Sequence, residues 1–154
     1  MSGQSDTGAD MSAGDTQDAE AVLGEFFAQM HAWEVAAHEL AERGNGGLEQ
    51  NLERIRQPLV LIYERFLTPK ERKTGRLAGP DVGWPPEYDP AQEPIVDSRR
   101  SGAKAVFETR WTHPTVADFS QRKKYYLLEK GGQWRIDKKE VFDTIKDKWV
   151  ARVF

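Results

Sequence analysis

The spacing of apolar residues changes part-way along this 154-residue chain. From Asp18 to Phe66 the large apolar side chains recur every three or four positions, and from residue 103 onward they alternate with polar ones. A repeat near 3.6 is that of an amphipathic helix, whereas a repeat of 2 is that of a strand with one buried face. Because the helical part comes first and the strands follow, the order predicts an α+β fold.

The helical part is expected to form a hairpin. Its first arm is predicted from Asp18, as N-cap, to Arg43, where the sequence Gly44-Asn45-Gly46-Gly47 ends it because these residues tolerate the backbone of a C-cap and turn. The second arm is predicted from Leu48 to Phe66. Pro58 lies inside that pattern and is expected to kink or restart the helix, which would give a bent arm.

Residues 69–94 contain most of the prolines and are expected to cross the molecule as an irregular loop. Residues 94–101 are expected to form a strand that pairs with the strand of residues 103–111. At the end of the chain, Ile145, Trp149 and Val153 are spaced by four, which favours a short terminal helix.

A β-hairpin is predicted around Gly131-Gly132, since a two-glycine link suits a tight turn that needs positive φ. If Lys130 lies opposite Gln133, then Leu127 lies opposite Ile136 and Tyr126 lies opposite Asp137. The face that carries Leu127 is the stronger candidate for the side covered by helices, because it also carries Tyr125, Trp134 and Ile136. Trp33 and Trp134 are expected in the core.

The formal net charge of −3 conceals a division along the chain, since all 22 Lys and Arg residues lie at or after Arg43. Residues 1–17 are small and polar and predict a disordered acidic tail, with residues 18–154 as a single domain. The division has two interpretations: an acidic first helix attracted to a basic sheet, or an acidic tail that meets a basic partner.

Several classes of site find no support in the sequence. There is no cysteine, and His31, His38 and His113 have no zinc-ligand spacing, so neither a metal nor a cofactor is expected. No secretory signal or membrane-spanning run is found, which predicts a cytoplasmic protein without membrane contact. Basic clusters beside Tyr125 and Tyr126 are interpreted as a solvated face, and no nucleic-acid partner is expected.

The chain resembles the nuclear transport factor 2-like cone fold, and within it the immunity proteins of bacterial polymorphic toxin systems. The hairpin from Arg122 to Asp137 carries the likeness to the fold. The likeness to the immunity proteins is carried by Met30-x2-Trp33-Glu34, Gln57-Pro58-Leu59, Phe66-Leu67-Thr68 and Pro85-Pro86-Glu87-Tyr88-Asp89. It implies an N-terminal helical hairpin packed on a curved antiparallel sheet.

The resemblance implies a cytoplasmic protein that neutralises a cognate toxin by direct stoichiometric binding, with no catalytic residues, and it leaves a homodimer open. Large aromatic residues in or beside exposed loops are typical interface anchors, although they can also pad the mouth of a cone. The predicted partner-binding residues are Trp84, Tyr88, Asp89, Trp111 and His113.

The alternative is a small-molecule-binding protein or an isomerase or dehydratase of the same cone fold. Such sites place a carboxylate with a raised pKa beside a tyrosine donor inside the cone. Tyr126 and Asp137 form the best such pair in this sequence. The alternative interpretation of this pair is a cross-strand contact on the surface of the sheet.

Overall fold

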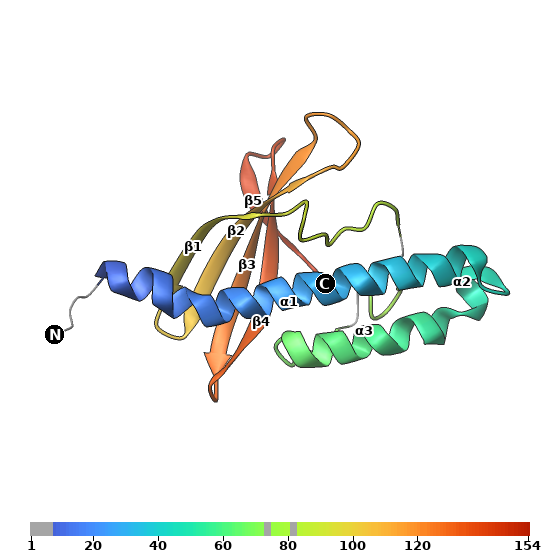
Figure 1. The fold of residues 1–154 in the computed structure, drawn as a ribbon, viewed down its shortest axis with the longest axis horizontal. Coiled ribbons are helices and arrows are strands. Elements are labelled where there is room, and N and C mark those ends of the chain that lie inside the picture. Colours follow the sequence, from blue (N-terminus) through green and yellow to red (C-terminus); the bar gives the residue numbers. More distant parts are fainter. Residues whose placement is uncertain (1–7, 73–74, 81–82) are drawn as a thin grey trace.

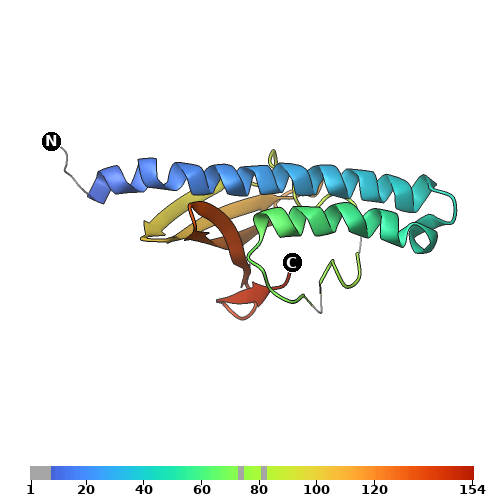
Figure 2. The ribbon, with the colours of Figure 1, turned by 90° about the horizontal axis from the view of Figure 1, so that it is seen from below.

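Two long helices lie side by side, and the first of them crosses one face of an antiparallel sheet, in the computed structural model (Figure 1), which describes residues 8–72, 75–80 and 83–154. Seen from below, the helices form one layer and the sheet the other (Figure 2). The helices are α1 (Gly8–Arg43), α2 (Gly47–Gln50) and α3 (Leu52–Phe66). The strands are β1 (Ile95–Ser101), β2 (Lys104–Thr112), β3 (Ser120–Lys130), β4 (Gln133–Asp143) and β5 (Lys148–Arg152).

The helical hairpin is confirmed, but its second arm is interrupted at Asn51 and not at Pro58, which lies inside α3. The Asn51 amide nitrogen donates to the carbonyl oxygens of Asn45 and Gly47 at 3.1 and 2.7 Å. This buried side chain therefore holds the turn between the arms, and the interruption falls beside it. The predicted restart of the helix at Pro58 is wrong, because a proline removes one hydrogen bond without necessarily ending the helix.

Helix α1 begins earlier than the predicted start at Asp18. It runs from Gly8 through a proline-free stretch, and Thr16 and Ala19 are buried within it. Extending an existing helix adds one hydrogen bond for each residue fixed, so a helix nucleated by packing extends readily into such a stretch. The predicted disordered tail thus overlaps α1 over residues 8–17, and residues 1–7 lie outside the described residues.

The sheet follows chain order, β1-β2-β3-β4-β5, with every neighbouring pair antiparallel. The predicted pairing of Leu127 with Ile136 and the strand at β1 are confirmed. The predicted pairing of Tyr126 with Asp137 is wrong, because the register shifts between Tyr126 and Leu127 and places Tyr126 opposite Lys138. A bulge of this kind puts an extra residue in one strand, and the sequence spacing does not reveal it.

The predicted terminal helix is also wrong, since residues 148–152 form strand β5 beside β4. Trp149 lies opposite Phe142, and their rings meet edge to face at 5.4 Å. Ile145 is 95% exposed in the turn, where the Asp143 carboxylate accepts hydrogen bonds from the backbone N–H groups of Ile145 and Lys146. The spacing of four therefore joins a turn residue, one residue of β5 and Val153, which follows that strand.

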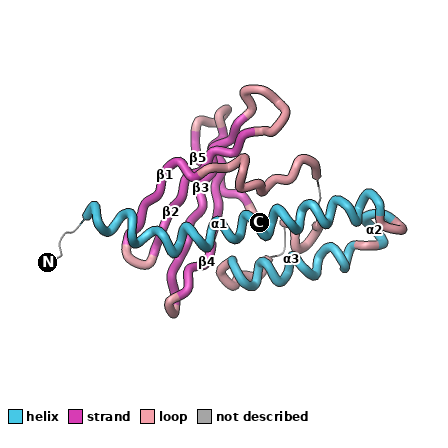
Figure 3. The backbone as a smooth tube through the Cα atoms, viewed as in Figure 1, coloured by secondary structure: helices cyan, strands magenta, loops and turns pink. Residues whose placement is uncertain are grey.

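A segment of irregular backbone connects α3 to β1, as the prolines predicted (Figure 3). We call the described residues between 67 and 94 the crossing segment. It begins beside the sheet, where Leu67 bridges to Ile136, and it ends where the Pro94 carbonyl accepts a hydrogen bond from Arg110. The segment thus touches two strands of the sheet.

The core lies between α1 and the sheet, and Phe26 is at its centre. Its ring is fully buried and contacts the rings of Phe66, Tyr88 and Phe154 at 5.9, 5.4 and 5.8 Å. These partners come from α3, the crossing segment and the last residue of the sequence. Trp33 and Trp134 are 5% and 6% exposed, which confirms the prediction that both belong to the core.

Replacing Phe26 with alanine should therefore loosen all of these elements together. We expect Phe26→Ala to lower the free energy of unfolding by about 3 to 5 kcal/mol, because it removes a large buried ring and leaves a cavity. Urea unfolding followed by circular dichroism measures the change. Leu61→Ala, at a side chain that is 67% exposed on α3, is the control and should change little. Similar losses in both variants would contradict this view of the core.

Candidate functional site

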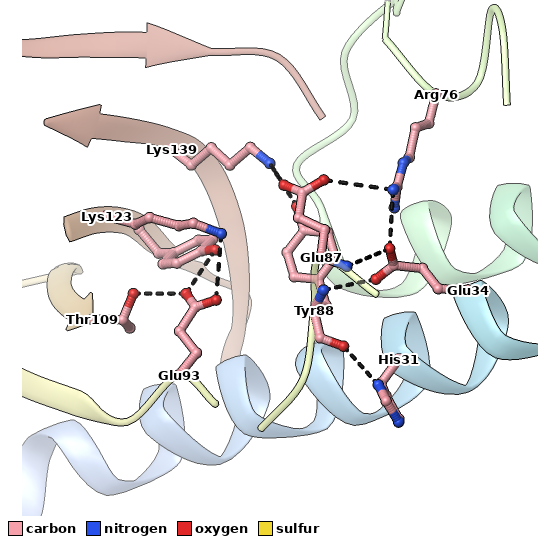
Figure 4. Close-up of polar contacts among 10 residues, drawn as sticks. His31, Glu34, Arg76, Glu87, Tyr88, Glu93, Thr109, Lys123 and Lys139 are labelled. Atoms are coloured by element: carbon pink, nitrogen blue, oxygen red, sulfur yellow. Dashed lines mark hydrogen bonds and ion pairs between the residues drawn. The ribbon is translucent and has the colours of Figure 1, made fainter. Parts of the chain in front are cut away.

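A buried carboxylate on α1 holds the crossing segment against the helices. Glu34 is 1% exposed, and its two oxygens accept hydrogen bonds from the backbone N–H groups of Glu87 and Tyr88, each at 2.7 Å (Figure 4). The Arg76 guanidinium, also in the crossing segment, donates to Glu34 at 3.0 Å. One side chain therefore fixes two places in a stretch of chain that has no regular secondary structure.

The same segment is tied to the sheet through Lys139 of β4. The Lys139 ammonium, with a residue exposure of 5%, lies 2.6 Å from the Tyr88 hydroxyl and 3.1 Å from a Glu87 carboxylate oxygen. Burial lowers the pKa of Lys139, and Glu87 offsets only part of this effect. Burial would raise the pKa of Glu87, but the charges of Lys139, Lys123 and Arg76 outweigh it and lower that pKa to about 2.

A second buried carboxylate, Glu93, lies just before β1 and reaches into the sheet. It accepts hydrogen bonds from the hydroxyls of Thr109 and Tyr125 at 2.7 and 3.1 Å, and the Lys123 ammonium lies 3.4 Å away (Figure 4). Glu93 and Lys123 are 2% and 3% exposed. Isolated buried charges are costly, so this pair and its hydroxyl donors are interdependent.

These clusters border a hollow of about 400 Å³ between the crossing segment and the sheet, lined in part by Arg76, Glu87, Tyr88, Lys123 and Lys139. The ammonium and guanidinium groups face carboxylates, and Glu87 is ionised at neutral pH. A general base working near neutral pH needs a carboxylate pKa that is raised, not lowered. The arrangement is that of an ionic clamp on the crossing segment.

The crossing segment contains three of the predicted partner-binding residues, and they occupy different environments. Trp84 is 59% exposed, follows Gly83 and stacks on the His38 ring of α1 at 4.7 Å. Asp89 is half-buried and accepts a hydrogen bond from the backbone of Ala91. Tyr88 is only 2% exposed, so its predicted role as a surface anchor does not fit; its ring fills the core instead.

The other two predicted residues, Trp111 and His113, lie at the end of β2 beside the loop of residues 113–119. Trp111 is 9% exposed and contacts the rings of His113 and Phe119 edge to face at 5.6 and 5.9 Å. The His113 ring nitrogen accepts hydrogen bonds from the backbone of Thr115 and Val116. Both residues shape the loop.

The exposed apolar surface of this loop belongs to residues that the sequence reasoning missed. Phe119 is 50% exposed and Val116 is 48% exposed. The signal that the sequence offered was an aromatic residue in a loop between two predicted strands. In the structure the neighbouring Asp118 has a φ of 61°, which marks a turn. Phe119 joins Trp84 as an aromatic side chain open to a partner.

The alternative catalytic pair is not formed. The Tyr126 hydroxyl donates a hydrogen bond to Glu140. Burial, and to a smaller extent this hydrogen bond, raise the pKa of Tyr126 to about 12. Burial would raise the pKa of Asp137, but hydrogen bonds from Lys70 and Thr68 outweigh it and lower that pKa. Asp137 therefore lacks the raised pKa that a catalytic base in a cone would have.

Comparison with known proteins gives the family. The family described as NTF2 fold immunity protein matches residues 18–152, which include both helical arms, the crossing segment and the whole sheet. The chain belongs to this family. It is 38% identical over 132 residues to the Immunity protein RhsIA of Dickeya dadantii (strain 3937), an alignment that covers 86% of this chain and 93% of the relative. No solved structure matches.

Family membership confirms the predicted cone fold and the function of an immunity protein, which is to neutralise a toxin. Over the described part of the chain, no helix is both long and apolar enough to cross a membrane. Within the same residues, no group of three or more His, Asp or Glu side chains is arranged to hold a metal ion.

Glu34 offers a direct test of the clamp. We expect Glu34→Gln to lower the free energy of unfolding by about 3 kcal/mol, because the amide loses the ion pair with Arg76 and presents a donor to a backbone N–H. Glu39→Gln, at an exposed pair with Arg43, is the control and should cost less than about 1 kcal/mol. Chemical denaturation measures both, and equal losses would contradict the clamp.

The lowered pKa of Glu87 predicts that the stability of the fold depends on pH. Its pKa falls from 4.5 to about 2 on folding, so its contribution to stability is complete above pH 4.5 and is lost as the pH falls toward 2. We expect the melting temperature of Glu87→Gln to fall less steeply over this range than that of the unmodified protein. Glu42→Gln, at an exposed position on α1, should retain the original slope. Parallel curves for all three proteins would contradict the assignment.

Proposed function

We propose that this immunity protein neutralises its cognate toxin by forming a direct 1:1 complex that covers a surface the toxin needs for its activity. Membership of the immunity family supports a toxin as the partner. The rigid sheet, held to the helices by the ionic clamp, supports binding without large rearrangement, because preorganised surfaces lose less entropy on association.

The exposed aromatic residues of two loops are the proposed anchors of this complex. Trp84 projects from the crossing segment and Phe119 from the loop before β3. Aromatic side chains that become fully desolvated at the centre of an interface contribute most to affinity. Asp89, Trp111 and His113 are proposed as neighbouring contacts or as supports of these anchors, and Tyr88 as a support from within the core.

The biological setting is part of the same proposal. We place the protein in the cytoplasm of a bacterium that makes the toxin as part of a polymorphic toxin system, with no catalytic activity, no cofactor and no nucleic-acid partner. The name of the similar Immunity protein RhsIA supports a system of this kind. A homodimer and a role for the acidic tail in meeting a basic toxin are further expectations.

The anchors can be tested with the cognate toxin, purified in an inactivated form. We expect Trp84→Ala and Phe119→Ala each to raise the dissociation constant at least about 30-fold, which is the effect of losing an anchor that contributes about 2 kcal/mol to binding. Isothermal titration calorimetry gives both the affinity and the stoichiometry. Protection of cells that express the active toxin should fall in parallel.

Leu61→Ala is the matched control, since this apolar side chain is 67% exposed on α3. Unchanged affinity in both aromatic variants, with unchanged folding, would show that the anchors are misassigned. A stoichiometry other than 1:1, or no complex at all, would overturn the proposed mechanism.

A further inference from the structure

The face of the sheet that points away from the helices is strongly basic. Along β2 and β3, residues alternate between the buried inner face and this outer face, which no helix of the described residues covers (Figure 2). The outer face of β2, β3 and β4 carries more basic than acidic side chains. The basic ones include Lys104, Arg110, Arg122, Lys124, Lys130 and Lys138, and the acidic ones include Glu108, Glu140 and, at the bulge of β4, Asp137.

The register of the strands makes this surface continuous. Arg110 lies opposite Arg122, and Glu108 lies opposite Lys124 in the neighbouring row. Two positions further along β3, Tyr126 lies opposite Lys138. The basic rows therefore run across the sheet from the end near the loop of residues 113–119 to the end near the β1–β2 turn.

Aromatic rings hold several of these cations in place. The Lys124 ammonium lies 4.4 Å from the centre of the Trp149 ring, and the Arg122 guanidinium lies 4.8 Å from that of Phe142. The Lys138 ammonium lies 4.5 Å from the centre of the Tyr126 ring. Cations fixed in this way lose less entropy when they meet an anion than freely moving side chains do.

The β1–β2 end of this surface is hollowed. A depression of about 670 Å³ is lined in part by Lys104, Val106, Tyr126, Leu128 and Lys138. Arg99, Arg100 and Asp137 also line it, and the Asp137 carboxylate is paired with the Lys70 ammonium at 3.0 Å. Lys104 and Lys138 are exposed, and neither forms a salt bridge with a carboxylate among the described residues. The depression thus offers two ammonium groups without a salt bridge around a partly apolar floor, beside a carboxylate that is already paired with Lys70.

We propose that this outer sheet surface docks an acidic surface of the cognate toxin, with an aspartate or glutamate side chain seated in the depression between Lys104 and Lys138. This inference rests on the proposed function and names the surface and the partner chemistry. Unpaired cations beside apolar floor atoms suit a carboxylate whose methylene groups pack on Tyr126 and Val106. Long-range attraction from the remaining basic rows would steer the association.

Two other occupants fit the surface less well. A second copy of this chain that packed the same face against itself would bring like charges together, which is unfavourable. A nucleic acid would meet Glu108 and Glu140, which lie among the basic residues and would repel its phosphates. An acidic protein surface can place its own basic or polar residues opposite these two carboxylates.

The test reverses the two unpaired charges. We expect Lys104→Glu/Lys138→Glu to lower the association rate constant with the inactivated toxin by about tenfold or more at low salt, and to reduce its dependence on salt. Surface plasmon resonance over a series of salt concentrations measures both. Arg43→Glu/Arg54→Glu changes the net charge equally on the helical layer and should retain the original rate.

A second variant and a second measurement keep the inference testable if the charge-reversed variant misfolds. Lys104→Gln/Lys138→Gln removes the charges without adding new ones and should give a smaller change in the same direction. Carbodiimide, which joins amines to carboxylates at contact distance, should link Lys104 or Lys138 to an aspartate or glutamate of the toxin in the complex. Mass spectrometry identifies the linked residues.

The outcomes separate this inference from the proposed function. If the 1:1 complex forms and the glutamate and glutamine variants of Lys104 and Lys138 both associate at the original rate, the sheet surface is not the docking site, while direct binding stands. If the unmodified protein forms no complex, the proposed function itself fails. Binding of a DNA duplex, or a change in oligomeric state by light scattering, that is lost only in the Lys104/Lys138 variants would assign the surface to those partners and overturn the inference.

Discussion

The two oxygens of Glu34 determine where the crossing segment lies, and much of the structure depends on that placement. By accepting hydrogen bonds from the backbone of Glu87 and Tyr88, this side chain fixes a segment that belongs to no helix or strand and lacks their regular backbone hydrogen bonds. Tyr88 is thereby held in the core against Phe26, and Glu87 is brought to Lys139 of β4. The helical layer and the sheet are thus joined through an irregular loop as well as through direct packing.

This clamp also explains how lysines come to lie inside the protein. Lys123 and Lys139 are almost completely buried, and each faces a glutamate of the crossing segment. A buried ammonium is costly unless it is paired, so neither lysine would be stable there without that segment. These buried pairs use the inner face of the sheet, so the charged side chains on its outer face do not take part in holding the crossing segment.

The charges of the chain are accordingly divided between internal pairing and the surface. Acidic side chains of α1 pair with cations of α3, of the crossing segment and of α1 itself: Glu25 with Arg65, Glu34 with Arg76, and Glu39 with Arg43. These pairs lie outside the sheet, unlike the attraction between helix and sheet layers that the sequence suggested. On the outer sheet face Arg122 pairs with Glu108, whereas Lys104 and Lys138 form no salt bridge among the described residues and are available to an acidic partner.

The sequence by itself determined the order and type of most elements, because helical and strand periods depend on local spacing between apolar residues. It also determined the hairpin at Gly131-Gly132, where only a local turn is needed, and the likeness of its motifs to an immunity family. The structure has α1 and α3 where helices were expected, with α1 beginning earlier at Gly8, and it has the four predicted strands among its five.

Only the tertiary structure decided the rest, because it depends on contacts between distant residues. Whether Trp149 belongs to a helix or a strand depends on the free edge of β4, and the position of Asp137 depends on a bulge that shifts it away from Tyr126. Tyr88 resembles a loop anchor in sequence, yet a carboxylate 54 positions earlier draws its backbone into the interior. Spacing along the chain carries no information on such pairings, since they are formed by packing and by the need to neutralise buried charge.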